Sequence, residues 1–125
     1  ITSSLTAFRG LPRSIGYTAS KAGTMSLAEC MYADLRKTGV QVQVINPGFI
    51  KTQLTDKNDL KMPFLMTPEE AAQQAFDHMN SDRFQTSDPC VSSLLFRFSR
   101  RLPASIYFLY CIPLLRCRRS TQVTS

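Results

Sequence analysis

Apolar and polar positions along the chain change their period several times, and each change predicts an element. Residues 17–38 contain no proline and repeat apolar side chains at helical spacing, which predicts one long helix. Gly39 stands where a left-handed cap at the carboxyl end of that helix is expected. Residues 40–45 alternate with period two and are rich in valine, which predicts a strand. We expect its pairing to stop at the turn formed by residues 46–48.

The predicted helix 17–38 has a wide apolar surface. One stripe follows the helical repeat and further apolar residues extend it round the side, so we expect two sides of the helix to be covered. Core packing and a contact within a homo-oligomer are the expected covers. The stripe is formed by Met25, Ala28, Tyr32 and Leu35, and its extension by Leu27, Cys30 and Met31.

The flanking segments complete an α/β order. Residues 1–5 fit the end of a strand, and residues 51–66 lack periodicity, which indicates a loop or short helices. Thr67-Pro68-Glu69-Glu70 predicts a helix start with a capping box, and this helix is expected to run to about Asn80. Residues 83–87 are a candidate last strand. Strands that alternate with helices predict a parallel sheet with crossover helices, and so few strands indicate half of a larger domain.

The excess positive charge lies in one part of the chain. The sequence of 125 residues has a net charge of +6, but residues 1–82 carry equal numbers of basic and acidic side chains. Residues 83–125 hold seven arginines against the single carboxylate of Asp88. A nucleic-acid-binding domain usually spreads its basic surface over the fold, and no standard motif is present. We therefore expect no nucleic-acid partner.

Residues 88–125 are expected to form a basic, apolar tail beyond a domain of residues 1–87. Residues 102–115 carry no charge and contain two prolines, and they are too few to cross a bilayer, which takes about 20 residues. Two alternatives remain open for this run. It packs against its own domain, a substrate pocket or another subunit, or residues 100–119 lie in a membrane interface with their arginines on anionic lipid.

The cysteines match neither a paired metal motif nor a redox Cys-x-x-Cys. With His78 as the one histidine, a zinc site would be hard to assemble. We expect reduced thiols, buried or incidental, in a cytoplasmic protein, and an exposed or half-buried His78 without a special role. The cysteines are Cys30, Cys90, Cys111 and Cys117.

Candidate chemistry gathers at one edge of the predicted sheet. Tyr17 and Lys21 are four residues apart at the start of the long helix, so about 40° of rotation separates them and they share a face. A nearby ammonium stabilises a phenolate, which lets a tyrosine exchange a proton with a substrate hydroxyl. Ser4 and the turn at 46–48 each follow a strand, and ligand sites in open α/β sheets lie at such strand ends. We expect these three elements to converge.

Taken together, the segments resemble the short-chain dehydrogenase/reductase family. The resemblance implies the C-terminal half of a Rossmann-type, doubly wound parallel sheet. It also implies an oxidoreductase that moves hydride between NAD or NADP and an alcohol or carbonyl. The segments that match the family's order and approximate spacing, all within residues 1–87, are Ser3-Ser4, the loop with Gly10 and Pro12, Tyr17-Thr-Ala-Ser-Lys21-Ala-Gly, and Asn46-Pro-Gly-x-Ile-x-Thr52.

The resemblance further implies a role for each matching catalytic position. Tyr17 would be the general acid and base. Lys21 would bind the nicotinamide ribose and stabilise the phenolate of Tyr17. Ser4 would donate a hydrogen bond to the substrate oxygen, where charge changes during the reaction.

The cofactor positions follow in the same way. Pro47, Gly48 and Ile50 would place backbone beside the nicotinamide, and Thr52 would contact the carboxamide or the phosphates. The apolar residues within 53–66 suggest a cover for an apolar substrate pocket.

The sequence also departs from the family. Its five glycines nowhere form Gly-x-x-x-Gly-x-Gly, the family's phosphate-binding turn, and the residue that selects NAD or NADP would also lie upstream. We therefore expect the N-terminal nucleotide-binding half to be missing and this chain alone to bind dinucleotide poorly. The chain is then a fragment of a longer enzyme, or a truncated and inactive remnant that acts only by protein or membrane-surface association.

Overall fold

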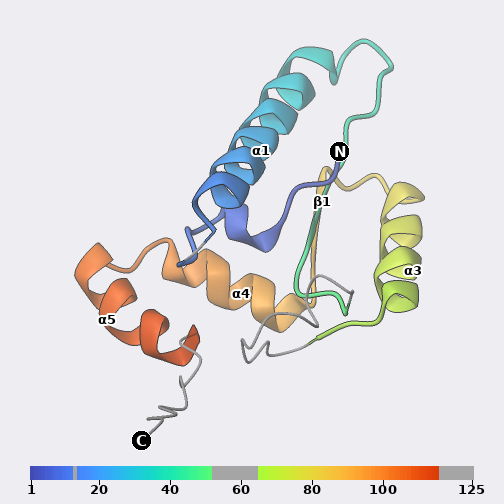
Figure 1. The fold of residues 1–125 in the computed structure, drawn as a ribbon. Helices are drawn as coiled ribbons and strands as arrows, with labels where there is room; N and C mark the ends of the chain where they lie inside the picture. The colour runs from blue at the N-terminus through green and yellow to red at the C-terminus, as the bar shows by residue number, and fades with distance from the viewer. Residues whose placement is uncertain (13, 52–64, 116–125) are drawn as a thin grey trace, which may run out of the picture.

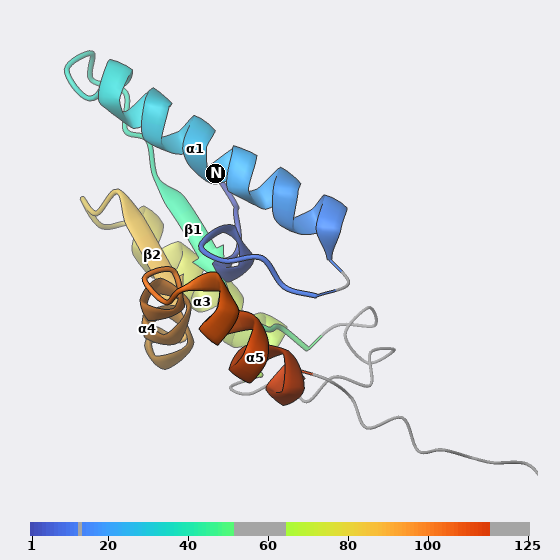
Figure 2. The same cartoon turned by 90° about the vertical axis from the view of Figure 1, so that its left-hand side faces the viewer.

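A short parallel sheet lies between helices in the computed structural model (Figures 1 and 2). The structure describes residues 1–12, 14–51 and 65–115, with side chains described up to residue 109. β1 (Val44–Pro47) pairs in parallel with β2 (Gln85–Asp88), and Val44 stands opposite Gln85. The parallel α/β order expected from the sequence is confirmed.

The first residues of the chain join the other side of β1. Thr2 forms a parallel bridge with Ile45, and the N–H of Ser3 donates to the carbonyl of Ile45 at 2.8 Å. The N–H of Ile45 in turn donates to the carbonyl of Ile1 at 2.9 Å. The segment therefore behaves as a strand end, as predicted, and β1 is paired on both sides.

Helices cover both faces of this sheet. Figure 1 shows η1 (Leu5–Ala7) and α1 (Ile15–Leu35) on one side and α3 (Pro68–Met79) on the other. α4 (Cys90–Ser99) packs against β2 and η1, and α5 (Ala104–Leu115) follows it. The layers place the start of α1 beside the end of the first segment, where the candidate residues lie.

The core forms where α1 meets the sheet. Met25 and Ala28 from α1 and Val44 from β1 are buried together, and Phe84 packs against them. Phe84 also stacks on Tyr32, with ring centroids 4.4 Å apart. The other side of α1 is open, since Leu27 is 56% exposed. The expected cover on two sides is therefore absent within the described residues, and the homo-oligomer contact stays a prediction.

The strand prediction was wrong about the turn at 46–48. β1 begins only at Val44 and continues through Asn46 and Pro47, which pair with Ser87 and Asp88. Odd-numbered positions of β1 direct their N–H groups toward the first segment, as Ile45 does. By Pro47 that segment has already turned into η1, so a residue without an N–H costs no ladder bond there.

Two local predictions about helix ends are confirmed. Gly39 has φ +82°, the left-handed conformation expected after α1. The Thr67 side chain accepts from the N–H of Glu70 at 3.2 Å, and Glu70 Oε2 accepts from the N–H of Thr67 at 2.8 Å. This reciprocal capping box starts α3, whose C-cap is Asn80.

The tail contains two helices that the sequence reasoning missed. α4 occupies Cys90–Ser99, and α5 begins after Pro103 and continues through Pro113. Tyr107 of α5 is 3% exposed, and its hydroxyl donates to the carbonyl of Gly10 at 2.7 Å. Within the described ranges, no helix is long and apolar enough to span a bilayer.

The expectation about His78 needs correction. His78 is buried rather than exposed or half-buried, because it lies on the side of α3 that packs against the sheet. Its carbonyl accepts from the Gln43 side chain at 2.9 Å. Cys30 and Cys90 are free thiols and both are exposed, and Cys111 and Cys117 lie outside the described side chains.

Candidate active site

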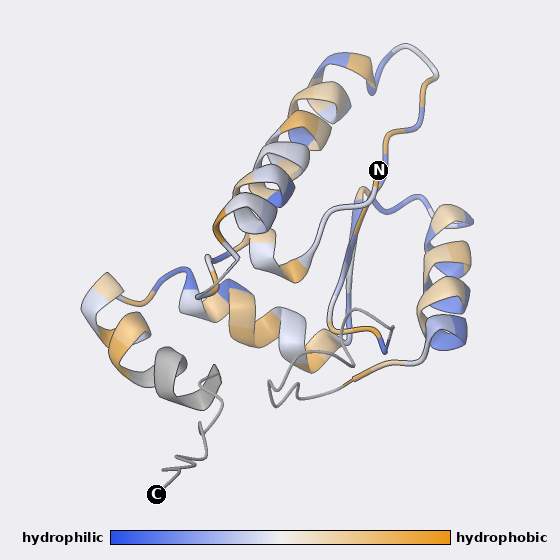
Figure 3. Ribbon diagram, viewed as in Figure 1, coloured by the Kyte–Doolittle hydropathy of each residue, from blue (hydrophilic) through white to orange (hydrophobic). Residues whose placement is uncertain are grey.

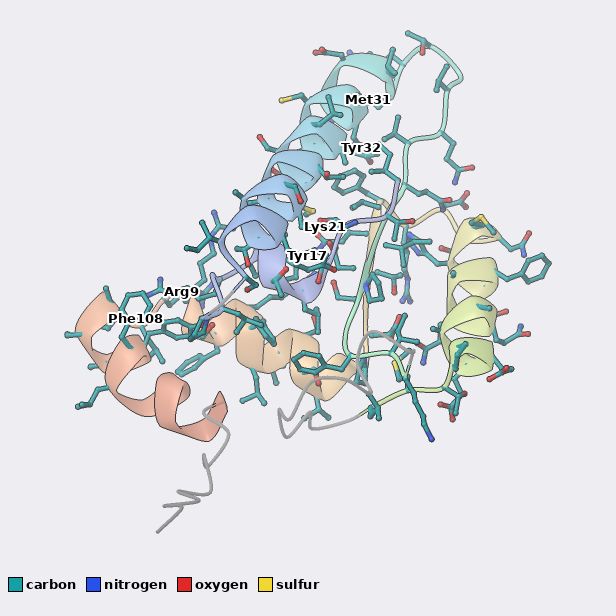
Figure 4. All side chains as sticks on the ribbon, in the orientation of Figure 1. Arg9, Tyr17, Lys21, Met31, Tyr32 and Phe108 are labelled. Atoms are coloured by element: carbon teal, nitrogen blue, oxygen red, sulfur yellow. The ribbon has the colours of Figure 1, made fainter. Side chains whose placement is uncertain are left out.

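Tyr17 and Lys21 lie together on the first turns of α1 (Figure 4). The Lys21 ammonium nitrogen is 5.7 Å from the centroid of the Tyr17 ring. Tyr17 is 51% exposed, whereas Lys21 is half-buried. The expectation that they share a face is confirmed, and a solvent-accessible phenol stands beside a partly shielded cation.

Lys21 is tied to the end of the first segment by two hydrogen bonds. Its ammonium group donates to the carbonyl of Thr2 at 3.2 Å, and the Ser3 hydroxyl donates to the carbonyl of Lys21 at 2.8 Å. Ser3 is itself almost fully buried and paired with β1. The position of Lys21 is therefore set by the sheet as well as by its own helix.

Ser4 follows directly, but it makes a different contact. Its side chain is buried, and its hydroxyl oxygen accepts from the N–H of Thr6 at 3.3 Å, which caps η1. None of the hydrogen bonds among the described residues joins Ser4 to Tyr17 or Lys21. Ser4 therefore follows Ser3, the residue whose hydroxyl bonds to the carbonyl of Lys21. In the bond to Thr6 the Ser4 hydroxyl acts as acceptor, so its proton can still be donated.

The turn after β1 lies beside the same segment. The N–H of Gly48 donates to the carbonyl of Asp88 at 2.7 Å. A Cβ placed on Gly48 would stand 3.3 Å from the Leu5 side chain and 3.0 Å from the carbonyl of Asp88. The turn after β1 therefore packs against Leu5, the residue that follows Ser4. Two of the three segments expected to converge, the one with Ser4 and the turn, thus lie at the same edge of the sheet.

The remaining cofactor positions are only partly described. Pro47 ends β1 opposite Asp88, and Ile50 forms a parallel bridge with Met66. Thr52 and residues 53–64 of the candidate pocket cover, which was expected at 53–66, lie outside the described residues. Among the residues that are described, no group of three or more His, Cys, Asp or Glu side chains could hold a metal ion.

Sequence reasoning missed two residues that organise this edge. Ser3 links β1 to α1, and two consecutive serines at a strand end were the only hint of it. Asn46 is fully buried, and its amide nitrogen donates to the carbonyl of Thr86 at 3.4 Å and lies 3.5 Å from Ser87 Oγ. Its side-chain oxygen is buried with no partner among the described residues. Asn46 therefore joins the two strands just before the turn.

A family model described as short chain dehydrogenase matches residues 1–63, which include both the Tyr17 helix and the turn after β1. The chain belongs to the short-chain dehydrogenase family. An uncharacterized oxidoreductase of Myxococcus xanthus is 37% identical over 105 residues, which are 84% of this chain and 42% of that protein.

Two further members of the family carry more specific names. The 3-oxoacyl-[acyl-carrier-protein] reductase FabG of Thermotoga maritima is 29% identical over 75% of this chain and 35% of its own length. The 1-deoxy-11-beta-hydroxypentalenate dehydrogenase of Streptomyces exfoliatus is 34% identical over 66% of this chain and 32% of its own. The chain thus spans less than half the length of these relatives.

Proposed function

We propose that the protein is an NAD(P)-dependent oxidoreductase that interconverts a small alcohol and its carbonyl, with Tyr17 as the proton donor and acceptor. The observation that carries this proposal is the pairing of a half-exposed phenol with an ammonium group on one helix face. The match to the family and the names of its relatives as oxidoreductase, reductase and dehydrogenase support the same reaction type.

Lys21 has two tasks in this proposal. It would place a positive charge beside the phenol that takes a proton from an alcohol and, in the reverse reaction, returns one to a carbonyl oxygen. An ammonium group has three N–H donors, and one of them is directed to Thr2. The other donors suit the hydroxyl groups of a ribose, so this donor set fits the nicotinamide end of NAD or NADP.

The bound nicotinamide would supply or accept the hydride, and the protein would orient the partners and handle the proton. Ser4 would donate its hydroxyl proton to the substrate oxygen, since its oxygen already accepts from Thr6. Pro47, Gly48 and Ile50 would line the nicotinamide with backbone. The close packing of Gly48 against Asp88 supports this role, because it holds the turn firmly against the sheet edge.

The direct test is dinucleotide-dependent turnover by the protein as its gene encodes it. A panel of apolar ketones and 3-oxoacyl thioesters is offered with NADH and with NADPH, and loss of the reduced nucleotide is followed by absorbance. We expect turnover with at least one nucleotide. Absence of turnover with both nucleotides, in both reaction directions, would overturn the proposal.

Replacement of Lys21 tests the nucleotide contact separately. We expect Lys21→Met to raise the KM for the nucleotide at least about tenfold, because one or two charge-assisted hydrogen bonds are lost. Lys37→Met is the matched control, since Lys37 is an exposed lysine that follows the other end of the same helix. Equal KM values in the two variants would remove Lys21 from the nucleotide site.

A further inference from the structure

α4 buries its polar side and exposes its apolar side, the reverse of an ordinary surface helix. Such a helix buries its apolar stripe and exposes its polar side. In α4 the buried side chains are all serines, and the apolar side chains at helical spacing are each more than half exposed. The buried residues are Ser92, Ser93 and Ser99, and the exposed ones, which we call the outer face of α4, are Val91, Leu94, Leu95 and Phe98.

The next helix also exposes apolar side chains. Phe108 and Leu109 of α5 are 51% and 66% exposed, and Figure 3 shows apolar colour on parts of α4 and on the coloured part of α5. Tyr107 holds α5 in place through its bond to Gly10, so these side chains are presented by a docked helix. Exposed apolar side chains gathered on one helix face, as on α4, mark a contact with another surface.

The charges around the outer face of α4 indicate what that surface is. Arg100 and Arg101 follow α4 and both are exposed, whereas the guanidinium of Arg97, in the last turn of α4, lies 5.3 Å from the centroid of the Phe8 ring. The chain has no acidic residue after Asp88. Two copies of the protein joined through this face would bring arginines together without a carboxylate to pair them. An anionic lipid surface supplies both the negative charge and an apolar depth.

We propose that the outer face of α4, with the exposed residues of α5, binds the surface of an anionic membrane. α4 then lies in the plane of the headgroups, with Leu95 and Phe98 below them and Arg100 and Arg101 on the lipid phosphates or carboxylates. The sequence left a membrane contact of residues 100–119 open as one of two alternatives. The contact proposed here is instead centred on α4, whose apolar residues precede that range.

The test is co-sedimentation of the full chain with vesicles. One set contains a phosphatidylserine-rich mixture and the other phosphatidylcholine alone. We expect binding to the anionic vesicles, weaker binding at raised salt, and little binding to the zwitterionic ones. The readout needs no turnover, so its outcome is independent of the oxidoreductase proposal.

Two variant pairs separate the apolar and the charge contributions. Leu95→Ser with Phe98→Ser should lower the partition coefficient at least about tenfold, because two large side chains no longer leave water. The matched control is Phe76→Ser with Met79→Ser on α3, which has the same spacing and exposures of 57% and 56% against 58% and 61%.

The charge pair is built in the same way. Arg100→Gln with Arg101→Gln should weaken binding to anionic vesicles by about tenfold or more, since each basic residue near such a surface contributes roughly 1 kcal/mol. Arg36→Gln with Lys37→Gln is the control, an exposed adjacent pair directly after α1.

Three outcomes would overturn the proposal. The first is no binding to either kind of vesicle, and the second is a loss of binding in the control pairs as large as in the α4 pairs. The third is a dimer in sedimentation velocity that dissociates with Leu95→Ser and Phe98→Ser, which would show that a second copy covers the outer face of α4 instead.

Discussion

Gly48→Ala should destabilise the protein because the turn after β1 has no room for a methyl group. The new Cβ would stand 2.9 Å from Pro89 Cδ and 3.0 Å from the carbonyl oxygen of Asp88, whereas ordinary contacts begin near 3.4 Å. Relief requires the turn to move away from Asp88, whose carbonyl accepts the Gly48 N–H at 2.7 Å. Overpacking of this kind costs about 1–3 kcal/mol, and the lower entropy of the unfolded alanine chain offsets about 0.4–1 kcal/mol.

Gly23→Ala gives the matched control with the opposite sign. Gly23 lies inside α1, and a Cβ there would meet nothing within 4 Å. Replacing a glycine by alanine in a helix interior should raise the free energy of unfolding by about 0.5–1 kcal/mol. Urea unfolding followed by circular dichroism should therefore order the stabilities as Gly23→Ala, wild type and Gly48→Ala, with similar m-values. A Gly48→Ala protein as stable as wild type would refute the close approach of the turn to Pro89 and Asp88.

Three further predictions concern the helix ends and the tail. Thr67→Ala should lower the free energy of unfolding, measured in urea, by about 1 kcal/mol, because it removes the N-cap side chain of α3. The N–H of Thr67 and then its side chain hold the pKa of the Glu70 carboxyl below its ordinary value. The capping contribution should therefore be complete above pH 4.5 and fall as the pH drops through the lower folded value, and Glu70→Gln should remove this acid limb. Tyr107→Phe removes the hydrogen bond to Gly10 and should lower the free energy of unfolding by about 1 kcal/mol, which would be visible as faster hydrogen exchange in α5.

Local patterns predicted those parts of the fold that local chemistry determines. The capping box at Thr67 and the cap at Gly39 depend on residues adjacent in sequence, and both have the expected geometry. The shared face of Tyr17 and Lys21 follows from helix geometry alone. These features needed no knowledge of what packs around them.

Features set by distant neighbours could not be predicted in the same way. Pro47 pairs within β1 because the neighbouring segment has already turned away, which depends on the position of η1. The link from Ser3 to Lys21 spans 18 residues and depends on how α1 crosses the sheet. The apolar residues of α4 recur at helical spacing, which the sequence reasoning missed, and their exposure could not be predicted because the pattern normally predicts a buried stripe.

The central claim, that Tyr17 transfers the proton, is tested most directly by the turnover of Tyr17→Phe. Tyr32→Phe is the control, a tyrosine on the same helix that packs on Phe84. With any carbonyl that the wild type reduces, we expect Tyr17→Phe to lower kcat at least about a hundredfold and Tyr32→Phe to leave it within about threefold. Turnover by Tyr17→Phe at the rate of the Tyr32→Phe control would contradict the role of this phenol.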